Sequence, residues 1–213
     1  DHHVSNSGFG DLSWVEPDMS SCGEMLYYLF KSMRLRIDAR SALAMYVAII
    51  TDTGNFSYEN TNSQTHTVIS DLLKTGVKPL WVSKQLNESK SLNDLRLLEY
   101  TLKTLRLHYG GRVSMMHTSK RMLKGLRVGP ASTENFVNYA RAISSVAIAV
   151  YLVERPDKNG EVHVSFRSKG DVNVNRLARI FNGGGHHNAS GCVIQGSIPR
   201  AEKVLLSKIR SFL

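Results

Sequence analysis

Asp1, His2 and His3 open the sequence and combine one carboxylate with two imidazoles. This ligand set suits divalent metals such as Mn, Fe, Co and Zn. A second carboxylate, Asp52, follows an apolar run and precedes the turn-forming Gly54, so the edge of the core should fix its backbone. A tag remnant or a solvated terminus also explains the His pair, and a helix-terminal turn explains Asp52 alone. The residue types therefore predict a metal site, although the His pair and Asp52 each have a simpler explanation when taken alone.

A second group of polar residues lies in the C-terminal half. Arg167 ends a predicted strand, where its planar guanidinium suits two oxygens of a phosphate or a carboxylate. Three consecutive glycines at 183–185 free the backbone for positive φ and let amide groups turn toward an anion. His186 and Asn188 add side-chain donors. Each feature alone is common on protein surfaces, so their combination carries the prediction of an anion site.

Two other interpretations of the glycines are less favoured. No Gly-Lys-Ser or Gly-Lys-Thr follows them, which argues against a Walker phosphate loop. They follow a helical pattern and precede a strand, which argues against a Rossmann site. His186 and His187 could also ligate a structural metal, but this needs partners such as His163 and Cys192 at suitable spacing.

The spacing of the first group resembles the DHH family of phosphoesterases. Its third and fourth motifs match Asp1-His2-His3 and the Asp-Thr-Gly-x-Phe run that begins at Asp52. The resemblance implies that His2 and Asp52 ligate metal, that His3 contacts substrate phosphate and that Asp1 braces the site. It also implies Mn2+ as the cofactor, in a two-metal site, with Mg2+ or Co2+ as substitutes. The family's other metal motifs are missing here, so we expect this sequence to be the C-terminal portion of a longer enzyme.

The second group resembles the DHH-associated C-terminal domain. Ser-x-Arg-Ser at 165–168 and Gly-Gly-Gly-His at 183–186 stand in the family's order. In that domain these motifs hold the nucleotide and its phosphates. With both motif sets in the family's order, the resemblance covers essentially the whole chain. The substrate-binding residues implied are Arg167, Ser168, Gly183, Gly184, Gly185, His186, Asn188 and Ser190.

Composition narrows the class of partner. The chain has 213 residues and a formal net charge of +9, which favours phosphate-containing ligands. No apolar run approaches the ~20 residues of a membrane span, so we expect no membrane partner. The two cysteines, Cys22 and Cys192, lie far apart without a Cys-x-x-Cys spacing. This favours buried free thiols, a reducing compartment and a cytoplasmic protein.

The elements that must position these residues follow from periodicity and capping signals. Asp38 can cap a buried second helix, and Gly110-Gly111 predicts a hairpin. The fold class is α/β, with the mostly helical C-terminal part of a DHH domain at 1–90, a basic linker helix at 91–107, and a smaller α+β substrate-binding domain with a mixed sheet at 108–213. The first predicted helix opens at a Ser–Glu capping signal in residues 20–24 and ends near 37. Ser63 is predicted to cap a third helix, and Pro79 to start a fourth. Further helices are predicted at 120–126, 133–143 and 174–181, and strands at 145–154 and 161–167 with a turn at 156–160 between them.

Within the family, the two-lobe layout resembles the branch of oligoribonucleases and 3′-phosphoadenosine 5′-phosphate phosphatases. The resemblance implies hydrolysis of short single-stranded RNA or that nucleotide bisphosphate, by metal-activated water attack on phosphorus. The alternatives are a nucleotide-binding fragment without turnover and a related hydrolase of cyclic dinucleotides or polyphosphate. A homodimer is a further expectation.

Overall fold

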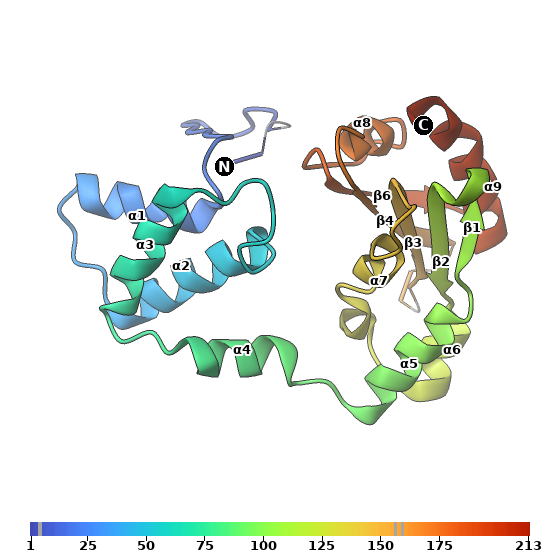
Figure 1. Ribbon diagram of the computed structural model, residues 1–213, viewed down its shortest axis with the longest axis horizontal. Coiled ribbons are helices and arrows are strands. Elements are labelled where there is room, and N and C mark those ends of the chain that lie inside the picture. Colours follow the sequence, from blue (N-terminus) through green and yellow to red (C-terminus); the bar gives the residue numbers. More distant parts are fainter. Residues whose placement is uncertain (4–5, 156, 159) are drawn as a thin grey trace. The chain divides into compact units, whose positions relative to one another are not determined.

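The computed structural model describes residues 1–3, 6–155, 157–158 and 160–213 (Figure 1). The chain divides into two compact units, Asp1–Ser89 and Lys90–Leu213. Within the described ranges, no helix combines the length and the apolar character needed to cross a membrane. Both cysteines are free: Cys192 is buried as expected, whereas Cys22 is exposed, contrary to expectation.

Helices are the only regular secondary structure in the described part of the first unit. Buried side chains from all of them share one core, with Tyr27, Ile49, Leu72 and Val82 as representatives. Asp38 caps the second helix as predicted, because its carboxylate accepts from the amide of Ser41 at 2.7 Å. The helices are Cys22–Ser32 (α1), Ala39–Asp52 (α2), Ser63–Leu73 (α3) and Pro79–Asn87 (α4).

Two boundaries in this unit differ from the prediction. The first helix ends at Ser32 instead of near residue 37, because Arg34 adopts a left-handed conformation with φ 54° and the chain turns away. The amide of Leu35 then donates to the carbonyl of Phe30 at 2.8 Å, which closes the helix end. The third helix is capped by Asn62, whose side chain accepts from the amide of Thr65, instead of by Ser63.

The second unit contains a six-stranded sheet in the order β1-β2-β3-β4-β6-β5. The β2–β3 pair is parallel and the other pairs are antiparallel, which confirms the predicted mixed sheet. The hairpin at the glycine pair and the antiparallel pair β3–β4 are also confirmed; the turn expected at 156–160 falls partly outside the described residues. The strands are Arg106–His108 (β1), Val113–Thr118 (β2), Ile148–Glu154 (β3), Glu161–Ser168 (β4), Gly184–Gly185 (β5) and Ala189–Gln195 (β6).

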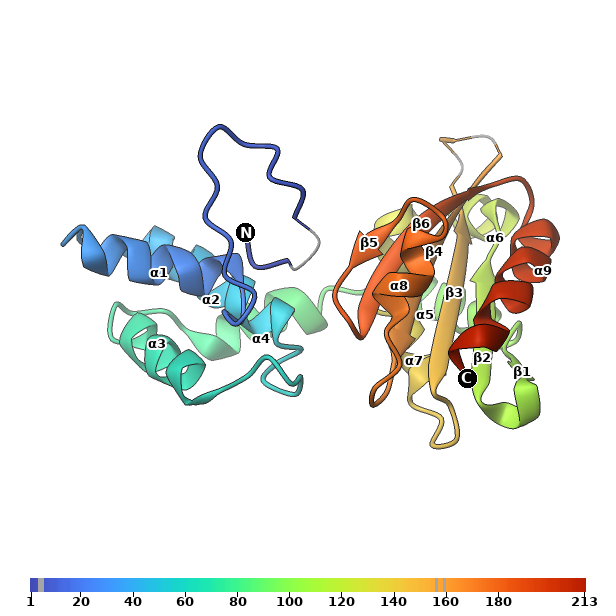
Figure 2. The same ribbon diagram turned by 90° about the horizontal axis from the view of Figure 1, so that it is seen from above.

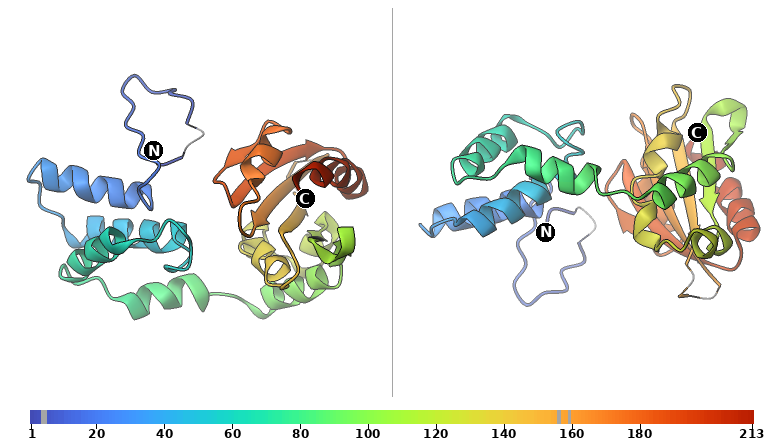
Figure 3. Two further views of the ribbon diagram at one scale, coloured as in Figure 1. Left: turned by 45° about the horizontal axis from the view of Figure 1, so that its top comes forward. Right: turned by 90° about the horizontal axis from the view of Figure 1, so that it is seen from below.

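The helices of the second unit cover both faces of the sheet (Figures 2 and 3). Central strand β3 is buried on both sides: Val150 packs in the cluster that includes α8 and α9, and Tyr151 packs in the cluster that includes α5, α6 and α7. Alternate residues of a strand point to opposite faces, so one strand serves both layers. The helices are Leu92–Leu102 (α5), Lys120–Leu126 (α6), Val137–Arg141 (α7), Val174–Arg179 (α8) and Ile198–Ile209 (α9), with 3₁₀ turns at Tyr109–Gly111, Pro130–Thr133 and Arg210–Phe212.

The helix expected at 91–107 is shorter than predicted and packs within the second unit. It spans Leu92–Leu102, and Leu97 is fully buried in the same cluster as Met116 and Leu123. The helix expected at 133–143 is likewise shorter, because a 3₁₀ turn ends at Thr133 and α7 begins only at Val137. The helix at Lys120–Leu126 has the predicted bounds.

Candidate functional site

The first unit brings Asp1, His2, His3 and Asp52 together near the N-terminus of α1 and the C-terminus of α2. A close helix contact makes this possible: a Cβ on Gly23 would lie 2.8 Å from the Cβ of Ala48, so glycine is needed there. His2 is 4% exposed, and its Nε2 lies 3.4 Å from Oδ2 of Asp52, whose side chain is 40% exposed. The predicted metal ligands are therefore adjacent, with Asp52 open to solvent.

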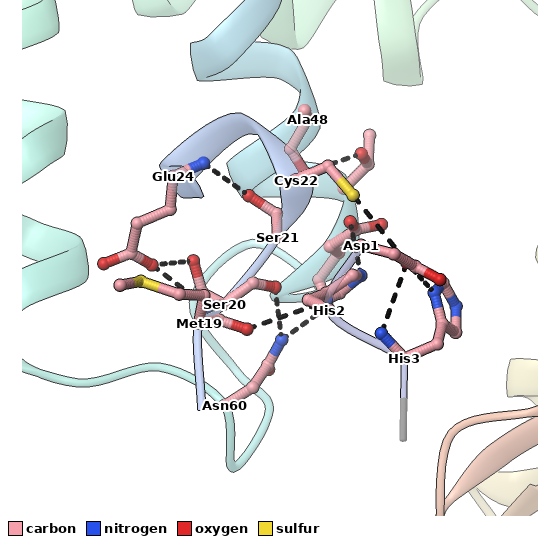
Figure 4. Close-up of polar contacts among 12 residues, drawn as sticks. Asp1, His2, His3, Met19, Ser20, Ser21, Cys22, Glu24, Ala48 and Asn60 are labelled. Atoms are coloured by element: carbon pink, nitrogen blue, oxygen red, sulfur yellow. Dashed lines mark hydrogen bonds and ion pairs between the residues drawn. The ribbon is translucent and has the colours of Figure 1, made fainter. Parts of the chain in front are cut away.

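The proton of His2 is fixed by a backbone contact (Figure 4). Nδ1 of His2 lies 3.2 Å from the carbonyl oxygen of Met19, which can only accept, so Nδ1 donates. Burial lowers the pKa of His2 more than Asp52 raises it, which favours the neutral ring. A neutral ring with its proton on Nδ1 directs the lone pair of Nε2 toward the carboxylate of Asp52.

Burial also dominates the electrostatics of Asp52. It raises the pKa of this carboxyl, and the nearby rings of His2 and His3 lower it to a smaller extent. Two electron-pair donors, Nε2 of His2 and Oδ2 of Asp52, thus lie 3.4 Å apart in partly desolvated surroundings. A cation between such donors relieves their repulsion, and a ring whose Nδ1 is held by a carbonyl is the usual form of a ligating histidine. The donors fit a divalent metal.

Asp1 orients the side chains of His3 and Asn6. Oδ1 of Asp1 accepts from Nδ1 of His3 at 2.7 Å, and Oδ2 accepts from the side chain of Asn6 at 2.8 Å. The thiol of Cys22 lies 3.9 Å from the same Oδ1. A ring held at Nδ1 by a carboxylate has a defined tautomer and orientation, which is what a residue that contacts phosphate needs.

A buried hydrogen-bond network supports the site, and it was not predicted from the sequence. Glu24 is 1% exposed, and its Oε2 accepts from the amide and the hydroxyl of Ser20 and from the hydroxyl of Thr65. Asn60 donates to the carbonyls of Ser20 at 2.8 Å and of Asp52 at 3.1 Å. The Met19–Ser20 segment that holds His2 is thereby tied to α1, to α3 and to the end of α2. Only the Ser–Glu capping signal before α1 hinted at these residues.

In the second unit, Arg167 lies near the end of β4. Its Nη1 donates to the carbonyl of Phe166 at 2.9 Å, and its residue partner on β6 is Ala189. Ser165 and Arg167 lie on one face of β4, whereas Phe166 points to the opposite face and is fully buried. The face of Ser165 and Arg167 is therefore the one on which β4 can present polar groups to a ligand.

The glycine run forms a tight hairpin against β6. A Cβ on Gly183 would lie 2.1 Å from the carbonyl of Gly191, and Gly185 has φ 136°, so both positions need glycine. The amide of Gly183 donates to Ala178 and that of His186 to Ala189, each within the loop and its neighbours. These two amides are not turned toward an anion, contrary to the expectation from the glycine pattern.

Three of the expected substrate residues are tied to their own surroundings. Ser168 and Ser190 are buried, and their hydroxyls donate to the carbonyls of Val172 at 2.6 Å and Val174 at 2.7 Å. The amide of Asn188 donates to the hydroxyl of Ser168 at 3.2 Å and to the carbonyl of Gly170 at 2.9 Å. This geometry favours a supporting role, in which these residues fix the glycine hairpin to the end of β4.

Comparisons with known proteins agree with this arrangement. Residues 118–213 match the model of the DHHA1 domain. The bifunctional oligoribonuclease and PAP phosphatase NrnA of Bacillus subtilis is 33% identical over 96% of this chain, and the protein of that name from Thermus thermophilus is 29% identical over 100% of it. The chain spans 64% and 63% of the lengths of these two relatives.

A solved structure gives the same assignment of fold. The exopolyphosphatase-related protein of Bacteroides fragilis has a TM-score of 0.87 and 29% identity, over 100% of this chain and 62% of that one. The segment that matches the DHHA1 model, the mixed sheet and the Gly-Gly-Gly-His hairpin all lie in the second unit. The C-terminal part of this chain is therefore a DHHA1 domain, the C-terminal domain of the DHH family.

Proposed function

We propose that the protein is a divalent-metal-dependent phosphoesterase that hydrolyses short oligoribonucleotides, 3′-phosphoadenosine 5′-phosphate, or both. The observation that carries the proposal is the pair of donors at Nε2 of His2 and Oδ2 of Asp52, 3.4 Å apart, with the His2 ring held by Met19. The names of the relatives supply the substrate class, since both describe an oligoribonuclease and PAP phosphatase.

The residues of the first unit then have distinct roles. His2 and Asp52 would hold Mn2+, with Mg2+ or Co2+ as substitutes. A divalent ion bound here would act as a Lewis acid and would lower the pKa of a coordinated water. With both ring nitrogens protonated, His3 would stay oriented by Asp1 at Nδ1 and would donate a hydrogen bond from Nε2 to the phosphate. The contact of Nδ1 with Asp1 thus sets the direction in which Nε2 of His3 points.

The residues of the second unit would bind the nucleotide. Arg167 offers a guanidinium for two phosphate oxygens, and His186 lies in the turn beside the glycine hairpin. Gly183, Gly184 and Gly185 would contribute backbone contacts to the ligand, while the absence of side chains at Gly183 and Gly185 is needed for packing against β6. Ser168, Asn188 and Ser190 would keep this surface in place through their backbone contacts. Positioning of substrate is a large part of catalysis for phosphate esters, so these residues affect rate as well as binding.

The test is hydrolysis of a 5′-labelled RNA dinucleotide and of 3′-phosphoadenosine 5′-phosphate by this polypeptide, with Mn2+ and with chelator. Turnover that requires Mn2+ and stops in chelator would support the proposed phosphoesterase. Saturable binding of both nucleotides without turnover would reduce the proposal to a nucleotide-binding fragment. Turnover that persists in chelator would contradict the metal dependence.

A polyphosphate hydrolase is the second candidate, because the similar solved structure is described as exopolyphosphatase-related. The two functions differ in how the rate depends on the base, which polyphosphate lacks. Equal turnover of inorganic polyphosphate and of the RNA dinucleotide under the same conditions would favour this candidate. Turnover of the dinucleotide alone would exclude it.

A further inference from the structure

A surface hollow of about 680 Å³ lies on the second unit, over β4 and β6 and beside the start of the glycine hairpin. Its volume falls within the ~300–1,000 Å³ typical of sites for small ligands. The residues that matter for its chemistry are His163, Ser165, Phe181, Asn182, Val193 and Gln195. None of them is among the residues assigned to metal or phosphate above.

The strand register explains why the sheet is hollow here. His163 is paired with Val193, and Ser165 is paired with Gly191, so the cross-strand partner of Ser165 has no side chain. Gly183 closes the edge, since it approaches the carbonyl of Gly191 too closely for any Cβ. The floor therefore consists of backbone and one small hydroxyl side chain, with larger side chains at its rim.

The lining has the chemistry of a nucleobase site. Among the described residues that line it, none is Lys, Arg, Asp or Glu. Val193, 41% exposed, and Phe181 offer apolar surface, while Asn182 and Gln195 carry neutral donors and acceptors. A flat base needs apolar contact on its faces and neutral hydrogen-bonding groups at its edges, whereas a phosphate chain needs cations.

The hollow also lies at a suitable position relative to Arg167. His163, Ser165 and Arg167 share one face of β4, because alternate residues of a strand point the same way. Two residues span roughly 7 Å along a strand. A nucleotide whose phosphate is bound by Arg167 can therefore extend along β4 with its sugar over Ser165 and its base beside His163.

We propose that this hollow is the nucleobase subsite, and that it makes the second unit selective for nucleotides over base-free phosphates. The inference rests on the proposed function, since it uses Arg167 as the phosphate contact. A binding site for the base would distinguish a nucleotide from polyphosphate, which has no base.

The test compares two ligands that differ only in the base, adenosine 5′-monophosphate and ribose 5-phosphate, by calorimetric titration of the whole chain. Val193→Trp fills the hollow with a neutral side chain, and Gln195→Ala removes a hydrogen-bonding group at its rim. Leu107→Trp is the matched control, since Leu107 is 51% exposed on β1, at the other edge of the same sheet. Urea denaturation of each variant checks that it is folded.

We expect Val193→Trp to weaken binding of adenosine 5′-monophosphate about tenfold and Gln195→Ala to weaken it about threefold, with ribose 5-phosphate unchanged in both. Leu107→Trp should change neither ligand. Equal affinity of the wild-type chain for the two ligands, or equal losses for both in the Val193 variant, would overturn the base subsite and leave the phosphate contact standing. Absence of any nucleotide binding by the wild-type chain would overturn the proposed function as well.

Discussion

The side-chain amide of Asn60 donates to the backbone carbonyl of Asp52 at 3.1 Å, and this contact fixes the end of the helix that carries a proposed metal ligand. The same amide donates to Ser20 at 2.8 Å. One side chain therefore joins the segment before α1 to the end of α2. Asn60 lies in the turn before α3, so three parts of the first unit meet at it.

Replacing Asn60 should destabilise the first unit. Asn60→Ala leaves the carbonyls of Ser20 and Asp52 without this donor, and we expect a loss of about 1–2 kcal/mol in the free energy of unfolding. Urea denaturation measures it. Asn87→Ala is the control, because Asn87 is exposed at the end of α4 and bonds only to Ser83 among the described residues. Equal effects of the two substitutions would refute the role given to Asn60.

Glu24 should be more sensitive to removal than to neutralisation. Glu24→Ala deprives the amide and hydroxyl of Ser20 and the hydroxyl of Thr65 of their acceptor in the core, which should cost roughly 3 kcal/mol of unfolding free energy. Glu24→Gln keeps an acceptor oxygen at that place and should lose less than half as much. A Gln variant as unstable as the Ala variant would show that the charge, instead of the hydrogen bonds, is what Glu24 contributes.

Acid should weaken the first unit through Asp71. The ammonium of Lys74 and the hydroxyl of Tyr27, at 2.8 and 2.6 Å, hold the pKa of this carboxyl well below its usual range. A depressed carboxyl pKa adds stability that is present above the unfolded value of ~3.9 and is lost as pH falls toward the folded value. Asp71→Asn should lower stability at pH 7 and flatten its decline below about pH 4. Urea denaturation from pH 7 to pH 3 tests this, and Tyr27→Phe should give an intermediate slope.

Arg167 should contribute to nucleotide affinity. Arg167→Ala should weaken binding of 3′-phosphoadenosine 5′-phosphate by about 1.5–3 kcal/mol, the range for hydrogen bonds to charged groups. Arg179→Ala is the control, because Arg179 is an exposed arginine at the end of α8. Calorimetric titration measures both. Unchanged affinity in the Arg167 variant would remove this residue from the site.

The sequence predicted the elements whose signals are local. Asp38 capped α2, the glycine pair formed the β1–β2 hairpin, and Lys120–Leu126 kept its bounds, because caps, turns and short-range periodicity act within a few residues. The first helix ended early because Arg34 takes a conformation usually given to glycine, so no residue type announced the stop. Asn62 and Ser63 are adjacent and both are favoured cap residues, so the sequence could not show which of them caps α3.

The site was predictable only in part, because contacts between residues far apart in the sequence leave no local signal. Motif spacing identified His2 and Asp52 as a pair, and the structure brings them to 3.4 Å. The carboxylate of Glu24 was not foreseen, because a buried Glu depends on Ser20 and Thr65, which meet it only after α1 and α3 pack. The hydroxyls of Ser168 and Ser190 could not be separated from ligand contacts by sequence, since their partners are backbone carbonyls.

Binding of Mn2+ by His2 and Asp52 can be measured at the His2 ring by 1H–15N NMR. We expect substoichiometric Mn2+ to broaden the ring signals of His2 in the wild-type chain, and we expect Asp52→Asn to abolish this broadening. Broadening that is absent, or equal in the wild type and the Asp52→Asn variant, would contradict a metal held by His2 and Asp52.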